Sequence, residues 1–283
     1  MTEQKSTREL QQWIVAQTES GRASQEMLKA MLAGGWDEDV AVQALSDTRQ
    51  ALLVEQGRLK LVPAATPVPE PDLRAAPSSV RIGDREVNVL MTLERPRMAV
   101  FGGFLSDAEC DELVALARAR LVRSETVAAS TGGSEVNDAR TSEGMFFERA
   151  EHAVCKRIEA RIAMLLNWPA QNGEGLQVLH YQPGDQYKPH HDYFDPAHPG
   201  TPDIVARGGQ RVATFVIYLN TPAKGGGTVF PDAGIEVAAV KGRALFFSYD
   251  RPHPMTASLH AGSLVLAGEK WVATKWLRER EFV

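Results

Sequence analysis

The stretch LQVLHYQPGDQYKPHHDYF, residues 176–194, begins the part of the chain that decides the fold. Two runs of strand-forming residues in it are separated by a Pro-Gly turn, which is typical of short strands. Further runs of this kind follow at 211–219 (RVATFVIYL), 227–231 (GTVFP), 234–240 (GIEVAAV), 243–249 (RALFFSY), 263–268 (SLVLAG) and 271–277 (WVATKWL). Many short strands in series, preceded by helices, predict an α+β fold with a double-stranded β-helix (jelly-roll) core.

Two amphipathic segments upstream of these strands predict supporting helices. Residues 105–121 (LSDAECDELVALARARL) combine a capping start with apolar residues at helical spacing. Residues 150–166 (AEHAVCKRIEARIAMLL) are expected to form a second helix. The jelly-roll core should therefore carry helices on one side.

The first 60 residues predict a separate helical region. The segments 6–21, 24–35 and 37–57 each begin with a capping residue and are closed by glycine. Their apolar residues are expected to share a small core, formed by Trp13, Leu28, Met31, Leu32, Trp36, Val40, Val42 and Leu45. A docking or oligomerisation module is the simplest interpretation, and an oligomer through these helices is compatible with it.

The stretch between this region and the strands predicts a domain boundary. Residues 62–79 contain five prolines among small and polar residues, a composition that keeps a chain extended and solvated. We therefore expect a Pro-rich linker at 61–80 and the main domain at 81–283.

Composition restricts the classes of protein. With 43% hydrophobic and 24% charged residues, the 283-residue chain is typical of soluble globular proteins, and no apolar run approaches the roughly 18–20 residues of a membrane helix. A net charge of −5 gives no reason to expect a nucleic-acid partner. The polar N-terminus lacks the apolar core of a secretory signal, so we expect a cytoplasmic location. Cys110 and Cys155 are the only cysteines, so a metal site has to use histidine and carboxylate.

His190 and Asp192 are the first candidate metal ligands. If residues 186–194 form one strand, their side chains alternate between the two faces. His190 and Asp192 then point one way, and His191 and Tyr193 point the other. A His-x-Asp pair alone is weak evidence for a metal, because surface strands carry such pairs by chance.

A third ligand has to arrive from a distant strand, and His253 and His260 both lie in the right region. Two histidines and one carboxylate on one face of an ion form the ligand set of non-haem Fe(II) oxygenases. The open positions of such an ion serve O₂ and a bidentate cosubstrate.

Lys270 strengthens this interpretation. It stands ten residues after His260, at the start of an apolar strand on which Val272, Thr274 and Trp276 share its face. A buried cation requires an anionic partner. The distal carboxylate of 2-oxoglutarate would provide one, while the keto-acid end chelates iron.

Four motifs together resemble the catalytic domain of prolyl 4-hydroxylases of the collagen and plant or microbial type. The motifs are YQPGDQYKPHHDYF (181–194), GGQRVATFVIYLN (208–220), GGGTVFP (225–231) and LHAGSLVLAGEKWVATKWL (259–277). The resemblance runs from about Phe101 to Leu277 and is densest after Leu176. It is specific because four motifs occur in the same order with matching spacings, and it implies that residues 81–283 are an Fe(II)/2-oxoglutarate dioxygenase domain.

The resemblance implies a role for each residue of the metal site. His190, Asp192 and His260 match the iron ligands of the family. Lys270 matches the salt-bridge partner of the 2-oxoglutarate carboxylate, and Tyr181 matches the tyrosine that hydrogen-bonds the same carboxylate.

The resemblance also implies residues that bind the substrate. Tyr187 and Trp276 match aromatic residues that line the prolyl pocket. Arg211 in GGQRVAT and Arg140 in NDARTSEG match substrate-binding or loop-ordering residues, and Thr228 matches a position with a structural role.

One position departs from the family. A non-histidine residue usually stands between the first two ligands, whereas His191 stands there in this chain. A shift of one residue would turn Asp192 away from the ion, so His190 remains the expected ligand.

The resemblance implies 4-hydroxylation of prolyl residues in a peptide or protein, with Fe(II), 2-oxoglutarate, O₂ and ascorbate as cofactors. Two alternatives stay open at this point. One is a dioxygenase that acts on a free amino acid or small metabolite. The other is a non-catalytic, metal-binding jelly-roll module.

Overall fold

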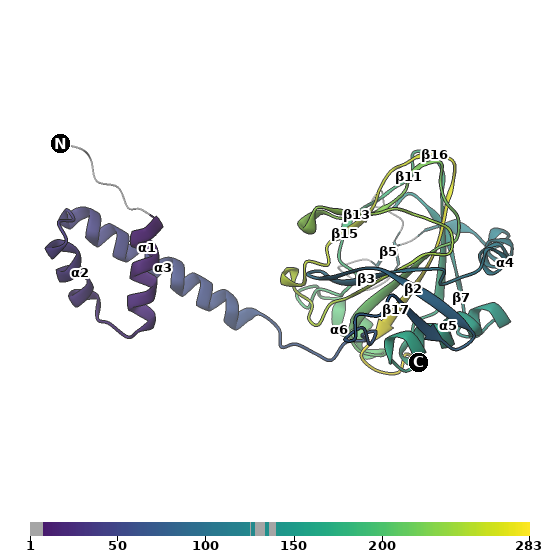
Figure 1. Cartoon of the computed structure of the whole chain (residues 1–283), viewed down its shortest axis with the longest axis horizontal. Coiled ribbons are helices and arrows are strands. Elements are labelled where there is room, and N and C mark those ends of the chain that lie inside the picture. The colour runs from purple at the N-terminus through teal and green to yellow at the C-terminus, as the bar shows by residue number, and fades with distance from the viewer. Residues whose placement is uncertain (1–7, 125, 128–133, 136–139) are drawn as a thin grey trace. The chain divides into compact units, whose positions relative to one another are not determined.

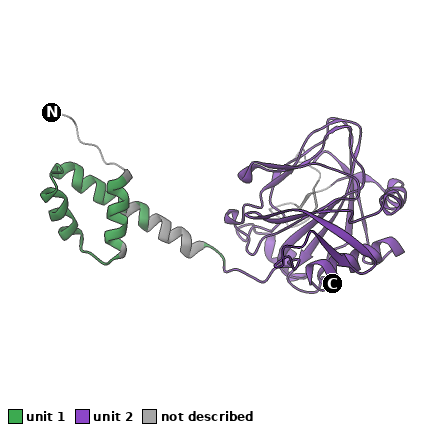
Figure 2. Ribbon diagram, viewed as in Figure 1, with its two compact units in different colours: residues 1–63 green, residues 64–283 purple. Residues whose placement is uncertain are grey.

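A computed structural model describes residues 8–124, 126–127, 134–135 and 140–283. The described residues form two compact units, one ending at Pro63 and the other beginning at Ala64 (Figure 2). No helix in the described ranges is long and apolar enough to cross a membrane.

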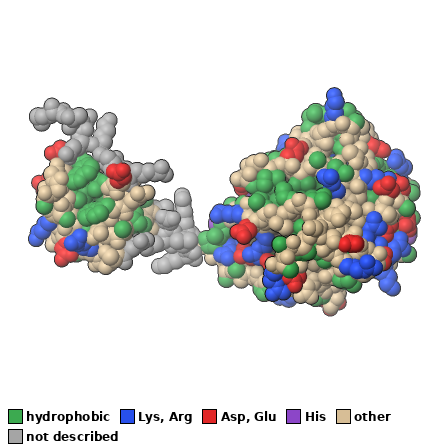
Figure 3. All heavy atoms as spheres, in the orientation of Figure 1, with side chains coloured by type: hydrophobic (Ala, Val, Ile, Leu, Met, Phe, Trp, Pro, Cys, Tyr) green, Lys and Arg blue, Asp and Glu red, His purple; other side chains and the backbone are tan. Residues whose placement is uncertain are grey.

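The N-terminal unit consists of α1 (Arg8–Glu19), α2 (Ser24–Ala33) and α3 (Glu38–Leu61). Its core agrees in part with the one expected from the sequence: Met31 and Leu45 are buried in it, and Trp13, Leu28 and Trp36 pack against it. The other buried members are Leu10, Ile14, Met27, Ala41 and Ala44. Leu32 and Val42 are 39% and 48% exposed, because their positions on α2 and α3 turn them to solvent. Hydrophobic side chains accordingly gather on the visible face of this unit in Figure 3.

The proline-rich stretch after Ala64 belongs to the second unit and is hydrogen-bonded to the rest of it. The amide of Thr66 donates to the carbonyl of Asp250 at 2.8 Å, and the amide of Glu70 donates to the carbonyl of Leu166 at 3.1 Å. This part of the Pro-rich segment was expected to be solvated. Its backbone is instead held against the rest of the second unit.

The second unit is built around two facing antiparallel sheets (Figure 1). The larger sheet has the order β1 (Ser79–Ile82), β2 (Arg85–Glu94), β3 (Arg97–Gly102), β14 (Ala244–Ser248), β10 (Arg211–Tyr218), β17 (Lys270–Arg278), β8 (Leu176–Tyr181), β7 (Glu143–Phe147) and β4 (Val122–Arg123). The smaller sheet has the order β13 (Ile235–Val237), β12 (Thr228–Phe230), β15 (His260–Gly262) and β9 (Tyr187–His190). Two short ribbons pair β11 (Lys224–Gly225) with β16 (Val265–Ala267) and β5 (Thr126–Val127) with β6 (Ser134–Glu135).

Strand periodicity sorts the side chains of the larger sheet between two cores. On β10, Phe215 and Ile217 pack in the cluster that faces the helices, whereas Val216 and Tyr218 pack in the cluster between the sheets. That second cluster also contains Phe230 of the smaller sheet. The sheets therefore enclose a common interior, and the jelly-roll fold predicted from the strand pattern is confirmed.

Helices cover the outer face of the larger sheet. The predicted helices are confirmed as α4 (Asp107–Arg118) and α5 (Ala153–Leu166). Ser106 and Glu109 form a reciprocal capping box that starts α4. The structure adds α6 (Thr201–Ala206) and the short 3₁₀ turns η1 (Ala170–Asn172), η2 (Pro231–Ala233) and η3 (Pro254–Thr256).

The strand that carries the first two candidate ligands is shorter than expected. The sequence favoured a strand over 186–194, but β9 ends at His190 and the chain bends at Asp192. The simple alternation argument thus stops at His190. Even so, the rings of His191 and Tyr193 stack on each other, with centroids 4.6 Å apart.

Candidate metal centre and active site

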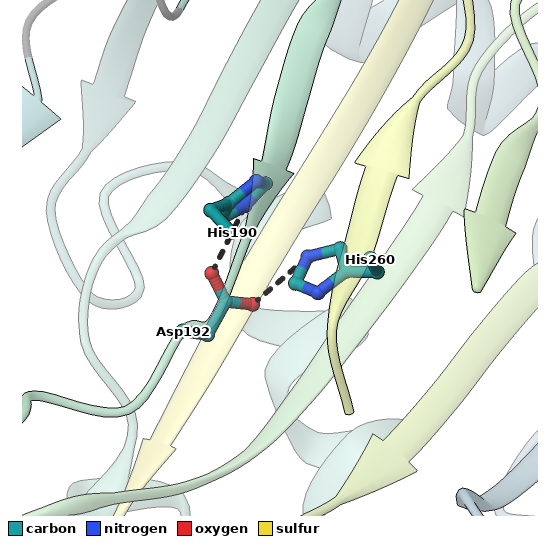
Figure 4. Close-up of side chains that lie close together, drawn as sticks. All are labelled: His190, Asp192 and His260. Atoms are coloured by element: carbon teal, nitrogen blue, oxygen red, sulfur yellow. Dashed lines mark ion pairs between the residues drawn. The ribbon is translucent and has the colours of Figure 1, made fainter. Parts of the chain in front are cut away.

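His190, Asp192 and His260 bring their polar atoms together (Figure 4). Strand β15 pairs with β9 so that His260 lies opposite His190. The Asp192 carboxylate lies between them, with Oδ1 3.5 Å from Nε2 of His190 and Oδ2 3.5 Å from Nε2 of His260. These separations suit neighbouring ligands on one ion whose bonds are roughly 2.0–2.2 Å long. Among the described residues, no other group of three metal-ligating side chains is this close.

Backbone carbonyls orient both imidazoles. Nδ1 of His190 lies 2.8 Å from the carbonyl oxygen of Lys188, and Nδ1 of His260 lies 3.0 Å from the carbonyl oxygen of Ser258. When Nδ1 donates to a carbonyl, Nε2 is left with its lone pair. Both rings therefore present Nε2 to the point next to Asp192.

The charge states of the cluster suit a metal ion. Burial and the adjacent His190 lower the pKa of His260 to about 4, so its ring is neutral at pH 7. Burial works against ionisation of Asp192, but His260 and His190 outweigh it and hold the pKa of the carboxyl well below its usual value. Neutral imidazoles and an ionised carboxylate are the forms that bind a metal.

Two residues not singled out in the sequence support the Asp192 carboxylate. Thr214 Oγ1 donates to Asp192 Oδ2 at 2.7 Å, and the Tyr249 hydroxyl lies 3.0 Å from the same Oγ1. Both lie on the interior faces of their chain segments. Thr214 carried a usable signal, because it is a polar residue at an inward position of the apolar strand β10.

Lys270 is a buried cation next to this cluster. It starts β17 opposite Tyr181 on β8, only 4% of it is exposed, and its Nζ lies 5.1 Å from the centre of the Tyr181 ring. Across the described ranges, no carboxylate makes an ion pair with it. Burial lowers the pKa of Lys270 to about 8, against a small opposing effect of Glu236.

The surroundings of Lys270 fit an anionic ligand. Its Nζ lies 3.8 Å from where a Cβ would stand at Gly262, on the strand that carries His260. A Cβ at Gly226 would stand 3.3 Å from Cδ of Lys270, and Gly226 has a φ of +73°, so both space and backbone favour glycine there. The GGG motif at 225–227 thus makes room for the lysine. A carboxylate beside Nζ would supply the charge that the site lacks.

A cavity of about 1000 Å³ opens in front of His190 and Asp192, which belong to its lining, whereas His260, Lys270 and Tyr181 do not. Its lining includes the predicted residues Arg140, Tyr187, Arg211 and Trp276 together with His190. The Tyr187 ring stacks on His190 with centroids 3.6 Å apart, and the Arg140 guanidinium lies 4.1 Å from the centre of the Tyr187 ring. The structure thus brings all four predicted substrate residues to one cavity beside the candidate ligands.

A buried ion cluster fixes Arg211. Its Nε lies 2.6 Å from Glu174 Oε1, and Arg278 approaches the same oxygen at 2.7 Å. The Arg211 guanidinium also lies 3.9 Å from the centre of the Trp276 ring. Sequence reasoning missed Glu174, which lies in an irregular segment just before β8 and carries no local signal. The cluster makes Arg211 a rigid wall of the cavity.

The remaining histidines lie outside the ligand group. His191, His198 and His253 line the cavity, and His253 caps η3 by accepting from the amide of Met255. His180 is buried on β8, where its Nε2 lies 2.8 Å from Glu269 and its ring stacks on Trp271. Trp271 belongs to the core on the helix side, so His180 faces away from the metal ligands.

Thr228 has the structural contact expected of it. The hydroxyl of Tyr218 donates to its Oγ1 at 2.8 Å in the interior between the sheets. This bond joins β10 of the larger sheet to β12 of the smaller one.

Comparisons with known proteins agree with this geometry. Residues 176–278 match the 2OG-Fe(II) oxygenase superfamily. The chain is 39% identical to prolyl 4-hydroxylase 2 of Arabidopsis thaliana over 236 residues, which are 74% of this chain and 75% of the relative. It is 42% identical to prolyl 4-hydroxylase 1 of the same plant over 218 residues, which are 71% and 75% of the two chains.

A solved structure gives the same result. The viral collagen prolyl hydroxylase of Paramecium bursaria Chlorella virus 1, in its 2OG complex, matches with a TM-score of 0.50 and 32% identity, over 64% of this chain and 95% of the viral one. Because the sequence identity extends over most of this chain and of its relatives, the protein belongs to the prolyl 4-hydroxylase family of the 2OG-Fe(II) oxygenases and is an Fe(II)- and 2-oxoglutarate-dependent dioxygenase.

Proposed function

We propose that the protein 4-hydroxylates prolyl residues within a peptide or protein. The observation that carries the proposal is the cavity in which Tyr187, Trp276 and Arg211 stand beside His190. Aromatic walls suit the flat, apolar pyrrolidine ring, and two of the candidate metal ligands, His190 and Asp192, line the same cavity. The family membership of the chain supports the same substrate class.

The residues of the chain divide into two groups in this proposal. His190, Asp192 and His260 hold Fe(II), and Lys270 with Tyr181 binds the distal carboxylate of 2-oxoglutarate. When bound, iron with 2-oxoglutarate and O₂ supplies the oxidising power for hydroxylation of a C–H bond, and ascorbate keeps the metal reduced.

The second group positions the substrate. Tyr187 and Trp276 hold the prolyl ring, and Arg211 is kept in place by Glu174. Arg140 stacks on Tyr187 and fixes the orientation of that ring. A ring held between these walls would be restricted to one orientation relative to His190 and Asp192.

The size of the cavity favours a peptide over a free amino acid. Its volume of about 1000 Å³ lies at the upper end of the roughly 300–1,000 Å³ found for sites of drug-sized ligands. A single proline would leave most of that space empty.

Mass spectrometry of peptide libraries tests the proposal. The full-length protein with Fe(II), ascorbate and 2-oxoglutarate should add one oxygen to prolyl peptides, with one succinate formed per hydroxyproline. Matched peptides with alanine in place of proline are the control. Oxygen addition to a metabolite pool, with none to any prolyl peptide, would contradict the proposal.

The location and the assembly of the protein stay predictions from the sequence. We infer a partner or second copy at the N-terminal unit from its exposed Leu32 and Val42. Light scattering of the full chain and of residues 64–283 tests the second copy, because only the full chain should then form oligomers.

A further inference from the structure

The lining of the cavity contains more basic than acidic side chains among the described residues, although the whole chain is acidic. The chain carries a net charge of −5. Among the described residues that line the cavity, the cationic ones are Arg120, Arg123, Arg140, Lys188 and Arg211, whereas the acidic ones are Asp192 and Asp195. On the face of this unit shown in Figure 3, by contrast, basic and acidic side chains are interspersed. A cavity with one dominant sign of charge concentrates ligands of the opposite sign.

Two of these cations have no carboxylate partner among the described residues. Arg120 is paired with Glu151 at 2.7 Å. Arg123, at the edge strand β4, donates to the carbonyl of Thr141, and Lys188 of β9 is exposed. Within the described ranges, neither Arg123 nor Lys188 makes an ion pair. Their charges are therefore available to a ligand.

Exposed apolar side chains accompany these cations. Val122 is 67% exposed and Phe146 is 49% exposed, and both line the cavity. Phe146 lies 6.4 Å from the ring of Trp276, which connects this surface with the predicted prolyl pocket. Apolar surface next to unpaired cations is typical of sites for peptide segments with both apolar and acidic side chains.

We propose that the substrate carries carboxylates close to its target proline, on the side that lies over β4, β7 and β9. Arg123 and Lys188 form exposed ion pairs with these carboxylates, and Val122 and Phe146 contact the apolar part of the segment. The inference rests on the proposed prolyl hydroxylation, because the target proline is what places the segment in this cavity.

Fluorescence anisotropy with labelled peptides tests the inference independently of turnover. The full-length protein is loaded with Mn(II) and 2-oxoglutarate, and peptides of one length contain a central proline flanked by Glu, Gln or Lys, placed before or after it. In one of the two placements, the Glu peptide should bind about threefold to tenfold more tightly than the Gln peptide, as expected for two exposed ion pairs. The Lys peptide should bind most weakly. The preference should shrink as salt is raised from roughly 20 to 300 mM.

Charge-reversal variants distinguish ion pairs made by Arg123 and Lys188 from a general electrostatic attraction of the peptide to the cavity. Reversing both charges, with Arg123→Glu and Lys188→Glu, should make the Lys peptide the preferred one. The matched control is Lys156→Glu, an exposed change on α5 outside the cavity, which should keep the preference for Glu. Circular dichroism verifies folding. If the double variant does not fold, Lys188→Gln alone should at least halve the preference.

The outcomes for the two proposals are distinct. Equal affinity for Glu and Gln peptides in both placements overturns the charge preference, while hydroxylation of the Gln peptide would leave the proposed function intact. Tighter binding of the Glu peptide without any hydroxyproline would contradict the proposed function and uphold the charge preference. A preference for Glu that survives the charge reversal overturns the assignment to Arg123 and Lys188.

Discussion

Lys270 is a buried cation that makes no ion pair in the part of the chain that the structure describes. Its position ten residues after His260 is legible in the sequence and suggested a carboxylate partner. Its burial was expected from its place at the start of an apolar strand, whereas the lowering of its pKa to about 8 follows from packing against Tyr181 and the backbone of Gly226, which no local pattern reveals. The chemistry was thus predictable from the residue type, and the electrostatics only from the fold.

The affinity for 2-oxoglutarate should depend on pH through Lys270. A bound carboxylate raises the pKa of the lysine above its value of about 8 in the free protein. The affinity for 2-oxoglutarate is therefore highest below that pH and falls as the pH rises, by about tenfold between pH 7 and pH 9. Calorimetry on the Mn(II)-loaded protein measures this affinity at each pH.

The matched control for this titration is Lys270→Arg, whose guanidinium stays charged over the whole range. Its affinity should be nearly constant from pH 7 to pH 9. An equal loss of affinity in both proteins would assign the titration to another group.

Thr214 should tune metal affinity through Asp192. Thr214→Val removes the donor to Oδ2 and keeps the shape of the side chain, so the affinity for Mn(II) should fall about tenfold to a hundredfold. Thr214→Ser, which retains the hydroxyl, should restore most of it. Competition with a chelator measures both, and an unchanged affinity of the valine variant would show that the hydrogen bond is dispensable.

At the scale of elements, clear patterns were predictable and interrupted ones were not. The capped helix at α4 and the apolar strands β8, β10, β14 and β17 follow from local periodicity. Strands β1 to β3 were missed although residues 80–101 contain an alternating pattern with a Gly-Asp turn. Strand β9 was predicted too long, because the bend at Asp192 is imposed by contacts with Thr214 and the ligand histidines.

The ion cluster at the junction of β8, β10 and β17 should contribute strongly to stability. Glu174→Gln leaves two buried guanidinium groups without their counter-charge, which should lower the free energy of unfolding by about 3–5 kcal/mol. Urea unfolding followed by circular dichroism measures the change.

Asp111→Asn is the control for that measurement. Asp111 is also paired, with Lys241, but its side chain is 69% exposed, so the free energy of unfolding should hardly change. Similar losses in the two variants would show that burial of the Glu174 cluster is not what makes it stabilising.

At the scale of the whole molecule, the pairing of distant strands builds the site. His190 and His260 are 70 residues apart in the sequence, and Lys270 also pairs with a residue far from it in the sequence, Tyr181. The sequence placed these residues together only through the resemblance to a family, because its own spacing left His253 and His260 as alternatives. Register between β9 and β15 sets His260, and not His253, opposite His190.

The catalytic unit should be independent of the N-terminal helices in its chemistry. Residues 64–283 have their own hydrophobic cores and contain every residue assigned to the metal, 2-oxoglutarate and prolyl sites. A chain that begins at Ala64 should bind Mn(II) and 2-oxoglutarate as tightly as the full protein. A loss of more than about tenfold would show that the N-terminal unit shapes the site.

Conversion of 2-oxoglutarate to succinate under air, with and without Fe(II), tests the central claim most directly. We predict iron-dependent turnover by the full-length protein and a loss of more than about a hundredfold in Asp192→Ala. Loss of a residue that binds the metal itself should reduce turnover more than loss of a residue that only supports such a ligand. His253→Ala, a change at a cavity histidine outside the ligand group, should keep most of the turnover. Full turnover by Asp192→Ala would contradict the assignment of the metal centre.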